Sequence, residues 1–303
     1  SQVGPVEPFQ QTAAELERLA FYQQPESWFV EHNAGSEIVD GQRLDPKLQY
    51  MLAEARAGRD HFTMAAPIIF STPWGRNYIR HDIDRAWTLY AKETAPMAAV
   101  ETVSIEGRHG PIQLRIYRPQ TDEGPLPVLV YAHGGGWIFA SLASTDRVAR
   151  LLANQARVIV VSVGYRLAPE HRYPAASDDG EDAYLWTREH AETFGGDPAR
   201  LGVGGDSAGG HISINIAQRQ IAEGRPPPAA MLLFYPGAGL PQRDRSYELF
   251  GEGYMLDSAF IEFILPRVFE DYSPGRESEA DGFMDPAGAA ADLSAMPPTI
   301  VAT

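Results

Sequence analysis

From residue 127 onward the sequence alternates between short, unbroken apolar runs and longer stretches with helical periodicity. Strands that are buried on both faces read as unbroken apolar runs, so this alternation favours a parallel sheet covered by helices on both sides. The runs expected to form its strands are 127–132, 157–163, 200–204, 230–236 and 299–303. The helices expected between them are 144–155, 175–193 and 208–223. We therefore expect an α/β fold with a mostly parallel central sheet flanked by helices.

The residues before this region have other patterns. The stretches "VETVSIEG" and "IQLRIYRP" alternate apolar and polar residues, which indicates two paired strands joined by the turn "RHGP". Earlier residues indicate helices, because Thr12 and Glu15 have the spacing of a capping box. Asp45 and Pro46 mark a second helix start, and Gly58 is the expected end of that helix. We expect a helical region up to residue 97 and an α/β core from residue 98.

One more amphipathic stretch lies late in the chain, between two expected strands. Residues 254–272 have helical periodicity, and Asp257 stands at the position of an N-cap. We expect this stretch to form a helix and to be a candidate second part of a lid.

Composition limits the classes of partner and chemistry. The formal net charge of −15 argues against nucleic acid and anionic membranes as partners, because both bind basic surfaces. The absence of cysteine excludes disulfides, thiolate catalysis and zinc–sulfur sites. No apolar run approaches the roughly 18 residues of a membrane span, and the first residues lack the pattern of a signal peptide. The expected location is therefore cytoplasmic by default, although a start at Ser1 rather than Met leaves room for processing.

The residues "GDSAG" at 205–209 match the pattern G-x-S-x-G between an apolar run and an expected helix. In this motif the serine, here Ser207, stands on a strained strand-to-helix turn that exposes its hydroxyl at the carboxyl edge of the sheet. The helix start adds unpaired N–H groups and the positive end of a dipole, which suit a developing oxyanion. The spacing excludes other glycine loops, because a dinucleotide fingerprint requires glycine at position 207 and a phosphate loop requires lysine after Gly209.

A second glycine cluster, "HGGGW" at 133–137, directly follows the expected strand 127–132. Three successive glycines let backbone N–H groups turn inward without obstruction by side chains. A loop in this place supplies the other oxyanion donors in G-x-S-x-G hydrolases. The two clusters together indicate a serine nucleophile facing an oxyanion hole.

The motifs resemble those of the hormone-sensitive-lipase-like family of α/β-hydrolase esterases. They occur in this order: "HGGGW" (133–137), "YRLAPEHRYPAA" (165–176), "GGDPARLGVGGDSAGGH" (195–211) and "LSAMPPTIVA" (293–302). The resemblance covers about residues 98–303 and implies an α/β-hydrolase fold. It implies that Ser207 is the nucleophile and that Gly135, Gly136 and Ala208 donate the oxyanion-hole N–H groups, with Gly134 shaping the turn.

Two positions depart from the family pattern. Gly164 stands where the family usually has an aspartate before "YRLAPEH", and His211 stands where asparagine is common after "SAGG". Neither position touches the chemistry of the nucleophile directly.

The resemblance also implies a domain organisation. Residues 1–97, with part of 240–272, are expected to form a helical cap that bounds the substrate pockets, and residues 98–303 the catalytic domain, incomplete at its C-terminus. Four aromatic residues are candidates for an apolar pocket wall, although each is also compatible with a place in the core: Trp137, Phe139, Trp28 and Phe29. The resemblance favours short to medium acyl chains over long triglycerides.

A serine nucleophile needs a histidine base and a carboxylate that orients it. The family places both after the strand "PPTIVAT", so we expect them beyond Thr303, in a longer protein rather than in a molecule that lacks a base. His211, the only histidine after Ser207, is expected to pack or to bond a loop, and His133 to hold the oxyanion loop. The polar stretch "RHDID" (80–84) is expected to be a solvated helix face. No metal or organic cofactor is expected.

The sequence therefore predicts a hydrolase of small-molecule carboxylic esters that works through a serine acyl-enzyme. Two alternatives stay open: a non-catalytic small-molecule receptor on the same fold, and an amidase or lactonase that uses the same serine. A homodimer is compatible with such folds, but the sequence identifies no pairing surface.

Overall fold

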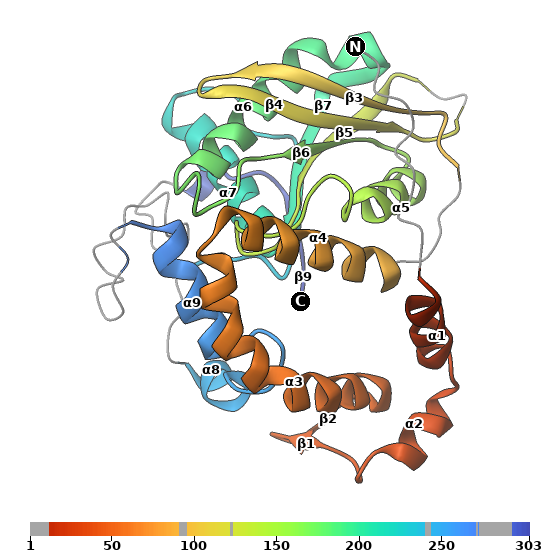
Figure 1. The fold of residues 1–303 in the computed structure, drawn as a ribbon. Helices are drawn as coiled ribbons and strands as arrows, with labels where there is room; N and C mark the ends of the chain where they lie inside the picture. The colour runs from red at the N-terminus through yellow and green to blue at the C-terminus, as the bar shows by residue number, and fades with distance from the viewer. Residues whose placement is uncertain (1–11, 91–95, 122–123, 240–243, 271, 273–292) are drawn as a thin grey trace. The chain divides into compact units, whose positions relative to one another are not determined.

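The computed structural model describes residues 12–90, 96–121, 124–239, 244–270, 272 and 293–303 (Figure 1). The chain divides into two compact units. The described residues of the first unit lie in Ile83–Leu240 and Pro266–Thr303, and those of the second in Phe9–Asp82 and Pro241–Leu265. That residues 1–97 with part of 240–272 act as a cap stays a prediction. None of the described helices is long and apolar enough to cross a bilayer.

The first unit is built on a seven-stranded sheet with the order β3-β4-β6-β5-β7-β8-β9. Its strands are β3 (Ala99–Gly107), β4 (Gly110–Arg118), β5 (Leu126–Ala132), β6 (Ile159–Gly164), β7 (Gly196–Asp206), β8 (Met231–Phe234) and β9 (Thr299–Ala302). The pairings of β3 with β4 and of β4 with β6 are antiparallel. The remaining pairings are parallel. Every apolar run predicted to be a strand is one, and the predicted strand pair is an antiparallel hairpin.

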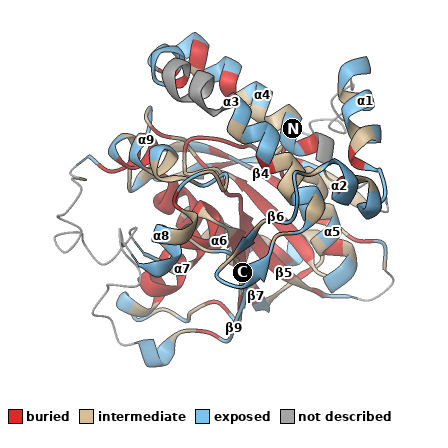
Figure 2. Cartoon of the chain, turned by 90° about the horizontal axis from the view of Figure 1, so that it is seen from below, coloured by how far each residue is buried: buried red, intermediate tan, exposed pale blue. Residues whose placement is uncertain are grey.

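Helices cover both faces of this sheet: α5 (Asp146–Ala156), α6 (Ala175–His190) and α7 (Ala208–Ala222). Side chains alternate between the two faces of a strand, so β5 contributes to two separate cores. Val128 and Val130 pack with residues of α6 and α7. Leu129 and Tyr131 pack with residues of α5. Helix α5 lies on one side of the sheet and helices α6 and α7 on the other (Figure 1), and the central strands between them are mostly buried (Figure 2). The predicted helices are therefore confirmed, and burial on both faces explains the unbroken apolar runs of β5 and β6.

The second unit contains helices and one small hairpin. They are α1 (Ala13–Tyr22), α2 (Glu26–His32), β1 (Ile38–Val39), β2 (Gln42–Arg43), α3 (Pro46–Phe70), α8 (Arg245–Phe250) and the beginnings of α4 (Pro73–Tyr90) and α9 (Ser258–Val268). The predicted capping box of Thr12 and Glu15 is present. The Asp45 side chain caps α3 by accepting from the amides of Lys47 and Leu48.

Two predicted helix boundaries are wrong. Helix α3 does not end at Gly58 but continues to Phe70, because one glycine costs a helix only about 1 kcal/mol. The helix predicted within 254–272 begins directly after Asp257, its predicted N-cap, but it ends at Val268 instead of continuing to 272. The residues before it form bends, and Met255 has a left-handed backbone (φ 67°) that no helix accommodates.

Candidate active site

Ser207 stands between β7 and α7 with φ 51° and ψ −116°. This left-handed conformation is strained for a residue with a side chain, so it persists only where the surroundings impose it. The Ser207 amide donates to the carbonyl of Phe234 (3.0 Å), and its carbonyl accepts from the amides of Gly237 (2.9 Å) and His211 (3.2 Å). The Ser207 side chain does not cap α7 and is partly exposed. The turn is therefore fixed through its backbone, which leaves the hydroxyl for other use.

Both glycines of the G-x-S-x-G motif are needed for space. A β-carbon on Gly205 would lie 2.4 Å from the carbonyl oxygen of Ala132, and one on Gly209 would lie 1.9 Å from the same atom. Real β-carbons do not approach other atoms so closely, and a backbone carbonyl cannot rotate away as a flexible side chain can. The end of β5 thus lies directly against the beginning of α7.

The triple-glycine loop begins at this contact. A β-carbon on Gly134 would lie 2.3 Å from Oδ2 of Asp206, the residue before Ser207. The next three residues all have positive φ: 107° at Gly135, 59° at Gly136 and 61° at Trp137. Among the described residues, the amides of Gly135, Gly136 and Ala208 have no hydrogen-bond acceptor. The loop and the helix start therefore offer unpaired N–H groups on two adjoining segments.

The carbonyls of this loop are turned to protein donors. The Gly135 carbonyl accepts from the amides of Ile138 (3.1 Å) and Phe139 (2.9 Å). His133 Nδ1 lies 2.7 Å from the Gly134 carbonyl, and because a carbonyl only accepts, this nitrogen carries the proton. Burial lowers the pKa of the His133 ring below its ordinary value, so the ring is neutral. The geometry supports the expected role of His133 as a residue that holds the loop.

Tyrosine hydroxyls support the same region. Tyr131 donates to Asp206 Oδ1 (2.7 Å), and burial, with the Asp206 charge, raises the pKa of this hydroxyl far above its ordinary value. The hydroxyl therefore stays protonated and continues to hold the carboxylate beside Ser207.

The profile of a family described as alpha/beta hydrolase fold matches residues 129–303, more than half of the chain. The chain belongs to the α/β-hydrolase family. Carboxylesterase NlhH of Mycobacterium tuberculosis is 43% identical over 265 residues, which are 86% of this chain and 77% of that protein. Carboxylic ester hydrolase LipN of the same organism is 36% identical over 275 residues, 88% of this chain and 69% of that protein.

Solved structures of similar proteins agree. An ester hydrolase from the metagenome of Lake Arreo, Spain, is 33% identical, with a TM-score of 0.72 over 83% of this chain and 76% of its own. The Pyrobaculum calidifontis esterase is 32% identical, with a TM-score of 0.67 over 75% of this chain and 73% of its own. The predicted fold, the resemblance to hormone-sensitive-lipase-like esterases and the prediction of an enzyme of the carboxylesterase class are thereby confirmed.

Within this α/β hydrolase, His211 lies among aromatic rings. The ring is buried and contacts Trp137 edge to face, with centroids 5.2 Å apart and planes at 90°. Phe269 lies against Trp137 (5.4 Å), and Tyr173 lies against Phe269 (5.3 Å). His211 therefore has the packing role expected of it. Trp137 directly follows the glycines of the triple-glycine loop, and its place in the wall of an apolar pocket stays a prediction.

The other aromatic candidates lie in packed positions. Phe139 is buried beside the loop. Trp28 and Phe29 belong to α2 and contact each other edge to face (5.2 Å) in the second unit. Phe29 is completely buried, and both rings pack against Phe21 and Tyr50. These contacts describe core residues of that unit, and a pocket role for them stays a prediction.

The stretch 80–84 is only partly the solvated face that was expected. His81 and Asp82 are exposed on α4, but Asp84 is half-buried and accepts a hydrogen bond from the Ser141 hydroxyl (2.7 Å). Three or more potential metal-binding side chains do not gather anywhere in the described part of the chain.

The supporting residues were the part of the site that sequence reasoning missed. Tyr131 is the last but one residue of β5, Asp206 is the last residue of β7, and Tyr165 directly follows β6. This was the available signal, because parallel strands bring their carboxyl ends to one edge of the sheet.

Proposed function

We propose that this α/β hydrolase cleaves carboxylic esters through an acyl-enzyme on Ser207. The observation that carries the proposal is the strained Ser207 at the start of α7, next to a loop in which the amides of Gly135 and Gly136 have no acceptor within the described part of the chain. In this proposal, Gly135, Gly136 and Ala208 form the oxyanion hole. In a well-studied protease the loss of one such donor raises the barrier by about 3–4 kcal/mol, so three donors can account for a large part of the catalysis.

In the proposed first step, Ser207 Oγ attacks the ester carbonyl carbon while its proton passes to a histidine base. The electrons of the carbonyl double bond move to the oxygen, where the amides stabilise the negative charge. Collapse of this intermediate breaks the bond to the alcohol, which takes the proton from the imidazolium. Water then repeats the two steps on the acyl-enzyme, releases the acid and restores the serine.

The base is not assigned to either buried histidine beside the turn. Nδ1 of His133 is used by the Gly134 carbonyl, and the ring of His211 is packed among aromatic rings. The family resemblance implies an aspartate and a histidine that follow the strand 299–303.

We propose that the preferred acyl chains are short to medium. The aromatic rings of Trp137, Tyr173 and Phe269 next to the oxyanion loop support a compact apolar wall. A relative in Pseudomonas putida, 34% identical over 73% of this chain and 69% of its own length, is named ethyl acetate hydrolase. The ester in that relative's name has a short acyl group, which supports the same preference here.

A phosphonate carrying a p-nitrophenyl leaving group tests the nucleophile. Ser207 Oγ should displace p-nitrophenolate and form a bond to phosphorus, and mass spectrometry should place the adduct on the peptide that contains Ser207. The ester hydrolase from Lake Arreo was solved with a phosphonate derivative, which makes this probe a suitable choice.

Two variants complete the experiment. Ser207→Ala should take up no phosphonate and hydrolyse no p-nitrophenyl ester. The matched control is Ser104→Ala, which removes an exposed hydroxyl on β3 and should behave as the parent. An unmodified parent protein would indicate a receptor, and an adduct on another residue would remove Ser207 from the mechanism. Hydrolysis rates for a series of p-nitrophenyl esters then report the chain-length preference.

A further inference from the structure

Residues 165–168, directly after β6, contact both ends of the triple-glycine loop. The Tyr165 hydroxyl lies 2.8 Å from the His133 carbonyl oxygen and 3.3 Å from that of Gly134. The Ala168 amide donates to the carbonyl of Trp137 (3.0 Å). We propose that residues 165–168, here called the brace, are a positioning element for the oxyanion hole, with Tyr165 as the principal positioning residue. This inference rests on the proposed function and names what holds its amides in place.

The reason lies in the geometry of the peptide bond. A trans peptide is planar, and its C=O and N–H point in opposite directions. A carbonyl held at residue 134 therefore fixes the direction of the N–H of Gly135. In the same way, the carbonyl of Gly135, held by Ile138 and Phe139, fixes the N–H of Gly136. The amides of the proposed oxyanion hole are thus aimed by hydrogen bonds on the reverse side of the loop.

The loop needs such support because its backbone is unfavourable. Trp137 has φ 61°, a conformation that a residue with a large side chain adopts only under constraint. The bond from Ala168 holds the carbonyl of this residue. Without external contacts the loop could rotate its peptides toward ordinary conformations, and the N–H groups would then turn away from the substrate.

Burial and ring stacking restrict the Tyr165 side chain to one position. Its side chain is buried, and its ring stacks on His133 with centroids 4.2 Å apart and planes at 23°. Burial raises the pKa of the hydroxyl well above its ordinary value, so the hydroxyl keeps its proton and remains a donor at neutral pH. Because one hydroxyl has one proton, the shorter contact to the His133 carbonyl is its main bond, and by the same peptide geometry this bond fixes the N–H of Gly134. Tyr165 acts on the N–H of Gly135 through the His133 ring, on which it stacks and whose Nδ1 holds the Gly134 carbonyl (2.7 Å).

The brace is itself anchored to helix α6. The Arg166 amide donates to Asp179 Oδ2 (2.8 Å). The Arg166 guanidinium donates to both carboxylate oxygens, from Nη2 to Oδ1 (2.8 Å) and from Nε to Oδ2 (2.9 Å). The Asp179 side chain is only 2% exposed. A bidentate pair of this kind fixes orientation as well as distance, and breaking a buried pair is strongly destabilising.

The test compares two tyrosines in the complete protein. Tyr165→Phe keeps the ring and removes only the hydroxyl. The matched control is Tyr117→Phe, which removes another buried hydroxyl, bonded to Asp146 (2.9 Å). Both variants should lose a similar amount of thermal stability. With a p-nitrophenyl ester, Tyr165→Phe should lower kcat by about 10- to 100-fold, a part of the loss that follows removal of a whole donor. KM should stay within about twofold, because the amides act mainly on the transition state.

The inhibition constant Ki of a trifluoromethyl ketone gives a second measurement, one that a loss of stability alone does not change. Ser207 adds to this ketone, and the resulting oxyanion occupies the proposed hole. Its Ki should rise in Tyr165→Phe by the same factor by which kcat/KM falls, and should be unchanged in Tyr117→Phe. If Tyr165→Phe does not fold, Arg166→Lys carries the test. Lysine keeps a positive charge opposite Asp179 but loses the bidentate geometry, so it weakens the anchor of the brace. In this variant too, Ki should rise by the same factor by which kcat/KM falls.

The outcomes separate this inference from the proposed function. If the parent forms the phosphonate adduct on Ser207 but Tyr165→Phe keeps kcat and Ki within about threefold of the parent, the brace has no positioning role. Equal losses of kcat in Tyr165→Phe and Tyr117→Phe would likewise overturn it. If the parent forms no adduct, the proposed function itself is wrong.

Discussion

The carbonyl oxygen of Ala132 lies 1.9 Å from the position that a β-carbon on Gly209 would occupy. The last residue of β5 thus touches the first turn of α7 through backbone atoms alone. The same oxygen would lie 2.4 Å from a β-carbon on Gly205. One carbonyl therefore explains both glycines of the motif around Ser207.

We predict that Gly209→Ala destabilises the protein by about 3 kcal/mol, the upper end of the usual range for overpacking. The new methyl group meets a backbone carbonyl, which can move only if the strand or the helix moves. Gly124→Ala is the matched control, because nothing lies within 4 Å of a β-carbon there. Urea unfolding of both variants checks the prediction. Equal stabilities would mean that α7 can shift away from β5 at little cost.

A second prediction concerns the strain at Ser207. At most positions glycine is less stable than alanine, because glycine loses more backbone freedom on folding. At φ 51° and ψ −116° the order should reverse, since such conformations cost a residue with a side chain about 1–3 kcal/mol. We expect Ser207→Gly to be more stable than Ser207→Ala by about 1 kcal/mol, with both variants inactive. Thermal unfolding of the two proteins decides this, and the usual order would show that the turn is relaxed.

The central strands β5 and β6 could be predicted because burial on both faces leaves a direct trace in the sequence. The start of β7 could not be predicted in this way. It begins at Gly196, four residues before the predicted run at 200, because Gly196 pairs with Leu126 of β5. That register depends on a partner distant in the sequence. The β1–β2 hairpin was also missed, although Asp40 and Gly41, with φ of 50° and 77°, are a typical two-residue turn.

The candidate site also has a part that could be predicted from the sequence and a part that could not. The nucleophile turn and the glycine loop are local motifs, so their residues could be named from short stretches of sequence. Their supports come from other parts of the chain. Tyr165 follows β6, and its neighbour Arg166 is held by Asp179 on α6. Nothing local indicates that a tyrosine hydroxyl will reach a carbonyl 32 residues earlier, because only the order of the strands brings them together.

His133 should make stability depend on mild acid. Its pKa is lowered in the fold by burial, from an ordinary value of 6.5. As the pH falls below 6.5, the unfolded chain binds a proton that the folded ring does not accept. The contribution of the neutral ring to the unfolding free energy is therefore complete above pH 6.5. Below this pH the contribution declines by about 1.4 kcal/mol per pH unit, since one proton is bound. The unfolding free energy of the parent should fall by about 1 kcal/mol more than that of His133→Gln between pH 7.5 and 5.5.

The control for this measurement is His81→Gln, which changes an exposed histidine on α4. We expect His133→Gln to flatten the pH dependence of the unfolding free energy more than His81→Gln does. If the two variants respond alike, another group is responsible for the acid sensitivity.

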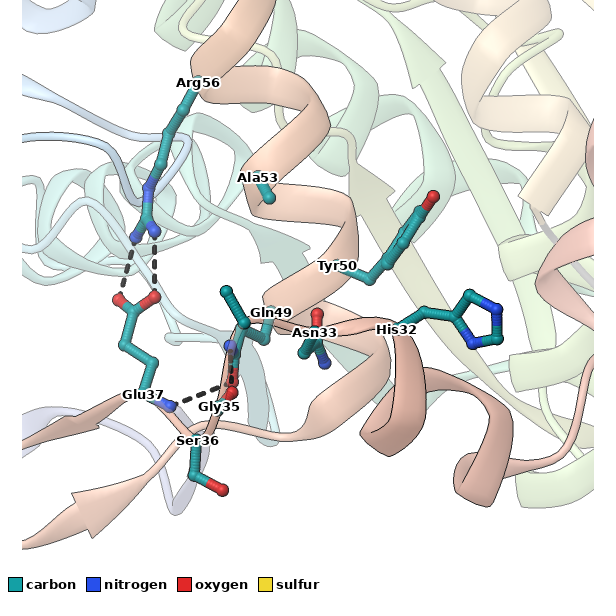
Figure 3. A pocket seen from close by; sticks show the side chains of 10 residues that line it. His32, Asn33, Gly35, Ser36, Glu37, Gln49, Tyr50, Ala53 and Arg56 are labelled. Carbon is teal, nitrogen blue, oxygen red and sulfur yellow. Dashed lines mark hydrogen bonds and ion pairs between the residues drawn. The ribbon is translucent and has the colours of Figure 1, made fainter.

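The last prediction concerns Glu37, which joins separate segments of the second unit (Figure 3). Its carboxylate accepts from Nη1 and Nη2 of Arg56 on α3, at 2.8 and 2.9 Å, and from the hydroxyl of Tyr254. The bonds from Arg56 and Tyr254 lower the pKa of Glu37 from 4.5 to about 2. The stabilisation is therefore complete above pH 4.5 and is lost as the pH falls toward 2. Because the Arg56 and Glu37 side chains remain 34% and 23% exposed, solvent screening limits the contribution to about 1 kcal/mol.

We expect Glu37→Gln to lower Tm at pH 7 by about 2–4 °C and to reduce the decline of Tm between pH 4.5 and 2.5. Glu31→Gln, a change at an exposed residue of α2, should leave both unchanged. Circular dichroism during heating, repeated across this pH range, provides the measurement. If Glu37→Gln loses stability with acid as steeply as the parent, the ion pair with Arg56 does not govern the acid response of this unit, and other carboxylates must do so.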